Sequence, residues 1–138
     1  MKLRVHETTK SRGDFGEAAA AKYLQKQGFR VKARNVHLSR YEIDIVAEDR
    51  QYIVFAEVKS RTVPHLDPDG NSPYAITPAM AVTKEKQRNL VRAARSYLLS
   101  HPTDKQPRLD VIEVYLCEKG HTFEVLKIHH IENAFGAG

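Results

Sequence analysis

Three carboxylates and a lysine recur at regular spacing in two short segments, Glu42-Ile43-Asp44 and Glu57-Val58-Lys59. Residues two apart on a β-strand point to the same face, so Glu42 shares a face with Asp44, and Glu57 with Lys59. If the two strands pair through the short connection at 48–51, those faces coincide. Two carboxylates and an ammonium group on one sheet surface can hold a divalent cation beside a phosphate. This is the chemistry of metal-assisted phosphodiester hydrolysis.

Asp44 and Glu57 also have simpler explanations. A solvated position on an open sheet face would account for Asp44 alone. Glu57 favours a site, because its strand neighbours are apolar and a charged pair of Glu57 and Lys59 there is costly unless each group has a partner or a task. A salt bridge on an edge strand is the remaining alternative.

Two further polar residues have apolar residues at helical offsets. The residues three, four and seven positions after Glu17 are Ala20, Ala21 and Leu24. Glu17 is therefore expected to face inward at the start of a helix, although a capping box with Asp14 explains it equally well. Gln87 shows the same pattern and is also expected to face inward. Lys86 is near enough to reach a phosphate, and a solvated position explains it as well.

The elements that position these residues follow from hydrophobic periodicity and turn residues. We expect helices at 15–27 and 84–100, and strands at 29–34, 41–47, 52–60, 109–117 and 122–129. The order is helix, three strands, helix, two strands, which predicts an α/β fold with a central mixed sheet flanked by helices. The strand at 52–60 is apolar on both faces, as is typical of a central strand. On the strand at 41–47, Ile43, Ile45 and Ala47 are expected on the face opposite Asp44.

The whole chain of 138 residues suits one domain. Residues 1–12 and 132–138 are expected to be loosely ordered ends. The segment 61–80 contains four prolines and is expected to be a long irregular loop. Such a loop either gates a substrate or is disordered.

Composition limits the function classes. Lys and Arg number 22 against 17 Asp and Glu, and the net charge of +5 is compatible with a nucleic acid partner without requiring one. The single Cys117 excludes an intrachain disulfide and is expected to be a buried, inert thiol. His129 and His130 are expected to be a solvated pair. No apolar run has membrane-spanning length and no signal peptide is visible, so we expect a cytoplasmic protein without membrane contact.

Basic residues alternate along the strand at 29–34. Arg30, Lys32 and Arg34 fall on one of its faces, where they could follow a nucleic acid backbone. A solvated strand face explains these three residues equally well.

The residues in their order resemble a known group of enzymes. The blocks that carry the resemblance are Gly16-Glu17, Ala21, Tyr23-Leu24, Gly28-Phe29, Arg34-Asn35, Glu42-Ile43-Asp44, Glu57-Val58-Lys59, Lys86-Gln87 and Arg108-Leu109-Asp110-Val111. They look like the PD-(D/E)XK nuclease superfamily and, more closely, the YraN-like family within it. The match runs over about residues 13–116. Asp-x(12)-Glu-x-Lys is a weak pattern alone, and the flanking blocks make it specific.

The resemblance implies a restriction-endonuclease-like fold and a metal site. Carried over by position, Asp44 and Glu57 would be metal ligands, with the backbone carbonyl of Val58 a third. Oxygen ligands favour Mg²⁺ or Mn²⁺ over zinc. Lys59 would orient the attacking water and stabilise charge on the phosphate. Similar cores occur in archaeal Holliday-junction resolvases, which act as dimers on branched DNA, so a homodimer is one of the oligomeric states left open.

Three further positions complete what the resemblance implies. Glu17 would complete the acidic site and Gln87 would assist. The family usually has Gly before Glu-Ile-Asp, where this sequence has Tyr41. A glycine allows unusual backbone angles, whereas Tyr41 would either crowd the site or stack on a base.

Three functions follow from these observations. The leading one is a Mg²⁺- or Mn²⁺-dependent nuclease acting on DNA in preference to RNA. In this hypothesis Tyr41, Lys86, Arg30 and Lys32 contact the nucleic acid. The alternative is a nucleic-acid-binding protein that has the fold without turnover, which Tyr41 favours. A third hypothesis, a structural or protein-interaction domain, predicts no salt-dependent affinity for nucleic acid.

Overall fold

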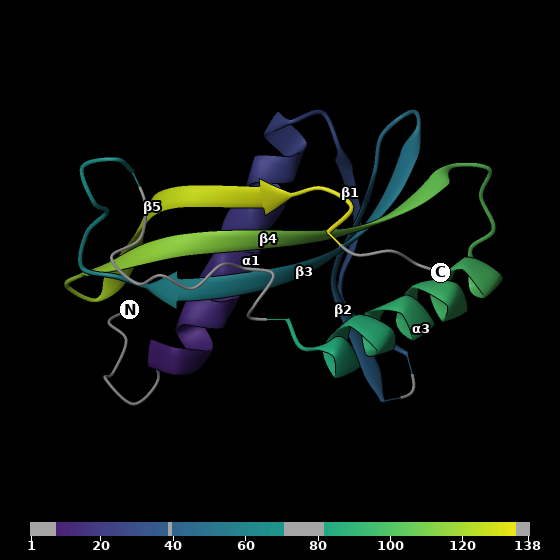
Figure 1. The fold of residues 1–138 in the computed structure, drawn as a ribbon, viewed down its shortest axis with the longest axis horizontal. Coiled ribbons are helices and arrows are strands. Elements are labelled where there is room, and N and C mark those ends of the chain that lie inside the picture. Colours follow the sequence, from purple (N-terminus) through teal and green to yellow (C-terminus); the bar gives the residue numbers. More distant parts are fainter. Residues whose placement is uncertain (1–7, 39, 71–81, 135–138) are drawn as a thin grey trace.

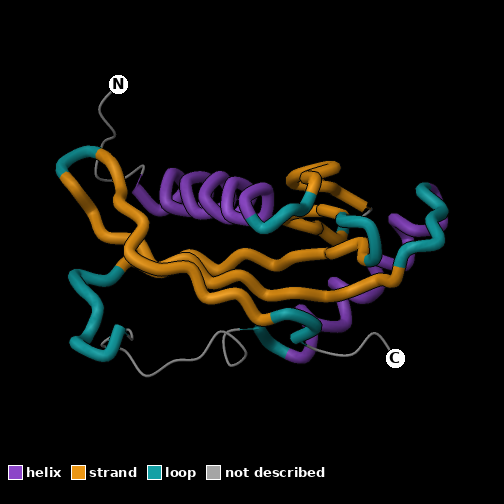
Figure 2. Tube along the Cα trace, turned by 90° about the horizontal axis from the view of Figure 1, so that it is seen from above, coloured by secondary structure: helices purple, strands orange, loops and turns teal. Residues whose placement is uncertain are grey.

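The computed structural model describes residues 8–38, 40–70 and 82–134. In this part of the chain a five-stranded mixed sheet has one helix on each face (Figures 1 and 2). The elements are α1 (Thr8–Lys26), β1 (Arg30–Leu38), β2 (Tyr41–Glu48), β3 (Tyr52–Thr62), α3 (Lys84–Ser100), β4 (Gln106–Lys119) and β5 (Thr122–Ile131). The predicted α/β class with a mixed sheet is confirmed.

The sheet has the strand order β1-β2-β3-β4-β5. Only β3 and β4 pair in parallel among the described strands, and the other neighbours are antiparallel. β2 and β3 do pair, which was the condition for their carboxylate-bearing faces to coincide. β3 is the middle strand, and its Phe55 and Ala56 are fully buried on opposite faces. This explains why β3 is apolar on both sides.

Two hydrophobic clusters lie on the two faces of the sheet. The first packs α1 on the sheet and includes Ala20, Leu24, Ile45, Ala56 and Ile112. The second packs α3 on the other face and includes Ile43, Phe55, Leu90, Tyr97 and Leu109. α1 and α3 thus hold the sheet between them.

The regular alternation of side chains between the two faces of the sheet is interrupted on β2 at Asp44. Ile45 belongs to the cluster beneath α1, whereas Ile43 belongs to the cluster beneath α3. The prediction that both isoleucines share the face opposite Asp44 is therefore wrong. The register runs from Arg34↔Ile45 to Val36↔Ile43, so the residue opposite Asp44 is Asn35. Asn35 has a φ of 51°, a left-handed conformation that asparagine tolerates, and it interrupts the alternation there.

Helix α1 begins earlier than predicted. It starts at Thr8, so Asp14 lies inside the helix and is exposed. The capping box of Asp14 with Glu17 is therefore wrong, because a capping residue must precede the first turn. No proline interrupts residues 8–14, so the helix extends through them. Residues 8–12 are consequently helical, and the remaining predicted loose N-terminus, 1–7, lies outside the described residues.

Gly16 allows α1 to approach β3 closely. A Cβ atom at this position would overlap the side chain of Ser60. The neighbouring residues on the two elements are Glu17 and Lys59. Gly16 therefore brings the helix and strand segments that carry these two residues together.

Helix α3 has the predicted bounds and a capped start. The side chain of Thr83 accepts a hydrogen bond from the backbone N–H of Lys86 at 3.1 Å. This cap satisfies a donor that a helix start otherwise leaves unpaired. It also fixes where α3 begins and hence where the Lys86 side chain leaves the helix.

The other strands extend past their predicted ends. β3 continues through Thr62, so the irregular segment begins at Val63 rather than at 61. The part of this predicted loop at 71–80 lies outside the described residues. At the C-terminal end, residues 132 and 133 form a turn, and the backbone N–H of Ala134 donates to the Leu109 carbonyl at 2.8 Å. The rest of the predicted loose end, 135–138, lies outside the described residues.

A buried network of polar side chains joins α1, β4 and β5. The carboxylate of Asp110 accepts from Arg108 at 2.9 Å and from the backbone N–H of Asn133 at 2.9 Å. His130 lies 2.7 Å from the same carboxylate and 3.0 Å from the Tyr23 hydroxyl. The predicted solvated histidine pair is wrong for His130, because Asp110 provides a buried partner that the local sequence does not show.

Two other predictions concern single features. Cys117 is half-buried near the end of β4 rather than buried, and its Sγ lies 3.6 Å from the Pro64 carbonyl oxygen. No helix in the described part of the chain is long and apolar enough to cross a membrane.

Candidate active site

The site lies where β2 and β3 separate. Their pairing runs from Glu48↔Ile53 to Ile45↔Ala56, and the next positions along the two strands are Asp44 and Glu57. There the carboxylate Oδ2 of Asp44 accepts a hydrogen bond from the backbone N–H of Val58 at 2.8 Å. A side chain thus closes the gap that the strands open, and it holds two carboxylate-bearing positions next to each other.

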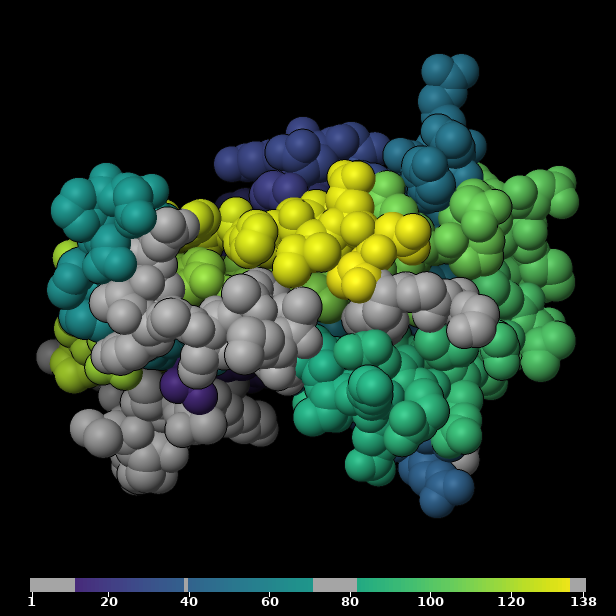
Figure 3. Space-filling view, viewed as in Figure 1, coloured from purple at the N-terminus to yellow at the C-terminus, as the bar shows by residue number. Residues whose placement is uncertain are grey.

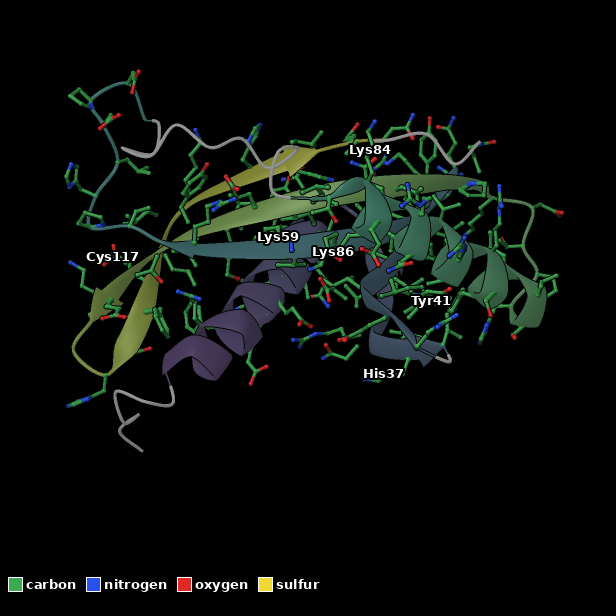
Figure 4. The ribbon with its side chains drawn as sticks, turned by 60° about the horizontal axis from the view of Figure 1, so that its bottom comes forward. His37, Tyr41, Lys59, Lys84, Lys86 and Cys117 are labelled. Atoms are coloured by element: carbon green, nitrogen blue, oxygen red, sulfur yellow. The ribbon has the colours of Figure 1, made fainter. Side chains whose placement is uncertain are left out.

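Glu57 lies between two ammonium groups. Its Oε1 is 3.3 Å from Nζ of Lys59 on the same strand and 3.8 Å from Nζ of Lys86 on α3. In Figure 4 the two lysines lie near each other, one from the middle of the sheet and one from the start of α3. Glu57 and Lys59 are mostly buried, whereas Lys86 is half exposed. Lys86 therefore reaches the site from the solvent side.

Carboxylates outnumber cations at the base of the site. Burial, together with the charges of Glu57, Glu17 and Glu42, raises the pKa of Asp44 to about 7, although the hydrogen bond from Val58 opposes the change. Burial likewise raises the pKa of Glu17. The Oε1 atom of Glu17 is buried without a hydrogen-bond partner, and Arg34 is 4.0 Å away. The site therefore has uncompensated negative character that a cation would relieve.

Lys59 is the buried cation of the site. Burial lowers its pKa, the nearby Lys86 lowers it further, and Glu57 opposes the change. A lysine in this setting still donates hydrogen bonds from its ammonium form but loses its proton more readily than a solvated lysine. It is positioned to interact with charge that develops beside Glu57.

A cavity of about 230 Å³ opens over Asp44, Glu57 and Lys86, whereas Lys59 is not among the described residues that line it. Its lining residues are Arg40, Tyr41, Glu42, Asp44, Glu57, Lys86, Asn89 and Leu90. The basic residues of this set are exposed, and the Asp44 and Glu57 carboxylates are more deeply buried. The Tyr41 hydroxyl accepts a hydrogen bond from Arg92 at 3.4 Å, and the Arg40 guanidinium lies 5.9 Å from the Tyr41 ring.

The donor set fits a hard divalent cation that is also bound by water and phosphate. In the described part of the chain, no three His, Cys, Asp or Glu side chains are placed to hold a metal ion by themselves. Mg²⁺ is commonly bound by one or two carboxylates, with waters and substrate phosphates as its other ligands. Asp44 and Glu57 supply two carboxylates. Because a paired strand residue directs its N–H and C=O to the same edge, the Val58 carbonyl is expected on the Asp44 side as well.

The other predicted residues lie outside the described cavity lining, some close to the site and some at the far end of β2. Glu17 approaches from α1 and acts on Asp44 through its charge, without being among the described residues that line the cavity. Gln87 is also outside that lining, and its side-chain amide donates to the Val82 carbonyl at 3.0 Å. Arg30 and Lys32 lie 3.2 Å and 3.7 Å from a carboxylate oxygen of Glu48, at the opposite end of β2 from Tyr41.

Sequence reasoning missed a buried acidic residue beside Lys59. Glu113 on β4 is the cross-strand partner of Lys59 and is fully buried. One of its oxygens accepts from Nε of Arg61 at 2.7 Å, and the other has no hydrogen-bond partner. Glu113 stands inside the apolar run Val111-Ile112-Glu113-Val114, which was the signal available in the sequence. Arg92 was also missed, because only the folded chain brings it to Tyr41.

Comparison with known proteins gives the family. Residues 16–114 match the family described as Uncharacterised protein family UPF0102. The chain belongs to the UPF0102 family. The predicted YraN-like assignment is thereby confirmed, while the wider superfamily stays a prediction. The matched range contains Glu17, Asp44, Glu57 and Lys59 together with the two candidates on α3, Lys86 and Gln87.

Relatives in the UPF0102 family align over nearly the whole chain. UPF0102 protein TTE1452 of Caldanaerobacter subterraneus subsp. tengcongensis is 39% identical over 127 residues, covering 91% of this chain and 95% of the relative. UPF0102 protein STH1475 of Symbiobacterium thermophilum is 40% identical over 126 residues, covering 91% and 96%. A UPF0102 protein of Geobacter metallireducens is 39% identical over 129 residues, covering 91% and 93%.

Proposed function

We propose that this UPF0102 protein is a Mg²⁺- or Mn²⁺-dependent nuclease that hydrolyses phosphodiester bonds in DNA, with a restriction-endonuclease-like core of the PD-(D/E)XK superfamily. The observation that carries the proposal is the separation of β2 from β3 at Asp44 and Glu57. Two mostly buried carboxylates meet there, with Lys59 against one of them. Such a cluster is costly for a fold and is typical of functional sites.

Each residue has a distinct role in the proposed reaction. Asp44 and Glu57 hold the cation, with the Val58 carbonyl as a third ligand. The Val58 N–H fixes the orientation of Asp44. A bound Mg²⁺ or Mn²⁺ supplies Lewis-acid polarisation of the phosphate and a bound water of lowered pKa. Lys59 orients that water and donates to the phosphate oxygens as their charge increases.

The surroundings favour a polyanionic substrate. The exposed cations Lys86 and Arg40 line the cavity, and Arg92 lies next to it against the Tyr41 hydroxyl. These cations attract phosphates, while the carboxylates beneath repel them until a cation is bound. Glu17 adds to the negative field that holds the cation. Gln87 assists indirectly, because its hydrogen bond to Val82 stabilises the start of α3 next to Lys86. Branched recombination or repair intermediates are the DNA class that the family resemblance favours.

A cleavage assay tests the proposal. Purified protein is incubated with single-stranded, duplex, flapped and four-way-junction DNA, in Mn²⁺ or in EDTA. We expect cleavage in Mn²⁺ alone, and a loss on the order of 10³-fold or more in Asp44→Ala and Glu57→Ala, because each removes a ligand. Glu48→Gln is the matched control, since it changes a carboxylate of β2 outside the site. Undiminished cleavage in both alanine variants would rule out this site.

The second candidate function is nucleic acid binding without turnover. Two observations favour it: in the described residues no three acidic or histidine side chains form a ready metal site, and Tyr41 lines the cavity. A protein with this second function would bind nucleic acid with an affinity that falls steeply as the salt concentration rises. It would show no Mn²⁺ binding that depends on Asp44 and Glu57. Calorimetric titration of Mn²⁺ into wild type and Glu57→Gln separates the two functions.

A further inference from the structure

An aromatic ring and a guanidinium group, those of Tyr41 and Arg40, line one edge of the cavity, and a second guanidinium group, that of Arg92, contacts the ring hydroxyl. Tyr41 is the first residue of β2, three positions before Asp44, and both residues line the same cavity. The Tyr41 hydroxyl is held by Arg92 of α3, and the Arg40 guanidinium lies near the ring. The space-filling view shows the end of the β1–β2 strand pair (blue) projecting past α3 (green) (Figure 3).

The ring is anchored but not enclosed. Tyr41 packs partly against the cluster beneath α3, and it remains partly exposed at the cavity. An aromatic side chain fixed in this way presents a preformed surface for a flat apolar ligand. The adjacent cations Arg40 and Arg92 are both exposed. The Tyr41 ring can therefore stack on a ligand while the two neighbouring guanidinium groups pair with its phosphates.

We propose that Tyr41 stacks on an unpaired base next to the scissile phosphate, so that the substrate is single-stranded nucleic acid, such as a flap or an overhang. Tyr41 acts as a specificity-determining residue, and Arg40 and Arg92 bind the phosphates that flank the stacked base. This inference rests on the proposed function, because only a nuclease has a scissile phosphate next to the stacked base. The stacking itself requires no cleavage.

Two physical arguments favour an unpaired base. A base within a duplex has both faces stacked on its neighbours, and exposing one costs several kcal/mol unless the strand is already single. The cavity of about 230 Å³ is smaller than typical small-molecule pockets and has room for a phosphodiester group with part of one nucleotide. Aromatic stacking beside a basic groove is the usual way in which proteins bind single strands.

A tryptophan probe tests the stacking directly. The sequence contains no tryptophan, so Tyr41→Trp introduces the chain's one indole. In EDTA, where a metal-dependent nuclease does not cut, we expect a single-stranded oligonucleotide to quench the indole fluorescence strongly. The same oligonucleotide annealed to its complement should bind without comparable quenching. Equal quenching by the duplex, or binding of the single strand without quenching, would overturn the proposal.

Affinity measurements supply an independent readout. By fluorescence anisotropy in EDTA, Tyr41→Ala should weaken single-strand binding roughly 5- to 150-fold and leave duplex binding nearly unchanged, whereas Tyr41→Phe keeps the ring and the affinity. Tyr52→Phe is the control for removal of a tyrosine hydroxyl outside the cavity lining. Equal losses for single strand and duplex in Tyr41→Ala would refute the base-stacking role. If stacking holds while no DNA is cut in Mn²⁺, the nuclease proposal fails and the binding site stands.

Discussion

The side chain of Asp44 accepts a backbone hydrogen bond at the point where β2 and β3 stop pairing. It therefore has two roles, one in closing the gap between the strands and one as a negatively charged group beside Glu57. The second role works against the fold when no cation is present, because burial and neighbouring carboxylates disfavour its ionised form. A residue that destabilises the free protein is expected where a ligand stabilises it.

Neutralising Asp44 should make the metal-free protein more stable. At pH 8 we expect Asp44→Asn to raise the free energy of unfolding by on the order of 1 kcal/mol, because it removes a charge from the crowded site while an amide oxygen can still accept from Val58. Thermal unfolding in EDTA measures this change. Mn²⁺ should then stabilise the wild type and the Glu48→Gln control, but not Asp44→Asn. Equal stabilisation of all three by Mn²⁺ would contradict a metal site at Asp44.

The site residues differ in how readily the sequence reveals them. Asp44, Glu57 and Lys59 could be predicted because the two-residue period of a strand needs only local sequence. Glu113 and Arg92 could not, since their positions depend on the pairing of β4 with β3 and on the placement of α3 over β2. Long-range neighbours of this kind are not encoded in local periodicity.

At the scale of elements, the contact of α1 with β3 depends on one glycine. Gly16→Ala should lower the free energy of unfolding by about 1–3 kcal/mol, because the new methyl group overlaps Ser60 and forces the helix away from the strand. Denaturant unfolding measures the change. Gly13→Ala is the matched control, since a Cβ there meets nothing within 4 Å and should stabilise the helix by up to about 1 kcal/mol. Equal effects of the two substitutions would show that the close approach is unimportant.

The buried network around Asp110 links β4 to β5 and makes the stability of the fold depend on pH in the acid range. Although burial opposes it, hydrogen bonds from His130 and Arg108 hold the pKa of Asp110 below its usual value. A carboxylate with a lowered folded-state pKa stabilises the fold above its unfolded pKa of about 3.9. That stability is lost as the pH falls through the folded pKa.

The corresponding variant is Asp110→Asn. At neutral pH it should be less stable than wild type by about 3 kcal/mol or more, because Arg108 loses its buried counter-charge. The difference should shrink as the pH falls below 4. Urea unfolding between pH 3 and pH 7 checks this, and a difference that stays constant over the range would contradict the role of the Asp110 charge.

The elements themselves were largely predictable. Alternation and helical spacing located α3 and the middle strands, because their apolar residues repeat with the period of a helix or a strand that packs on a core. The interrupted alternation at Asn35 and Asp44 was not predictable. One residue in the left-handed backbone conformation produces it, and the residue types around it do not reveal it. The start of α1 was misplaced because Asp14 and Glu17 imitate a capping pair inside a longer helix.

At the scale of the whole molecule, the net charge of +5 is less informative than where the cations lie. Lys86 lines the cavity and Arg92 contacts Tyr41 next to it, whereas Arg30 and Lys32 both lie against Glu48 at the other end of β2. Because Lys86 itself lies 3.8 Å from Glu57, the two groups differ in their place beside or away from the proposed site, where a cation has most effect on a bound polyanion.

Salt dependence distinguishes these two groups of cations. In the double variant Lys86→Gln/Arg92→Gln, the slope of log affinity against log salt should fall by about 1–2, as expected for the loss of one or two phosphate contacts. The double variant Arg30→Gln/Lys32→Gln removes the same charge and should leave the slope nearly unchanged. Anisotropy titrations from low to moderate salt measure both. A larger effect of the second variant would place the nucleic acid along β1.

The most direct test of the nuclease proposal is the single-turnover rate of cleavage of a flapped DNA in Mn²⁺ by wild type, Lys59→Met and Lys84→Met. In the proposed reaction Lys59 acts without binding the cation, and Lys84 is an exposed lysine at the start of α3. We predict that wild type and Lys84→Met cut at similar rates, and that Lys59→Met binds DNA and Mn²⁺ but cuts at least about 10²-fold more slowly. Equal rates for all three proteins, or no cleavage by wild type, would contradict the account.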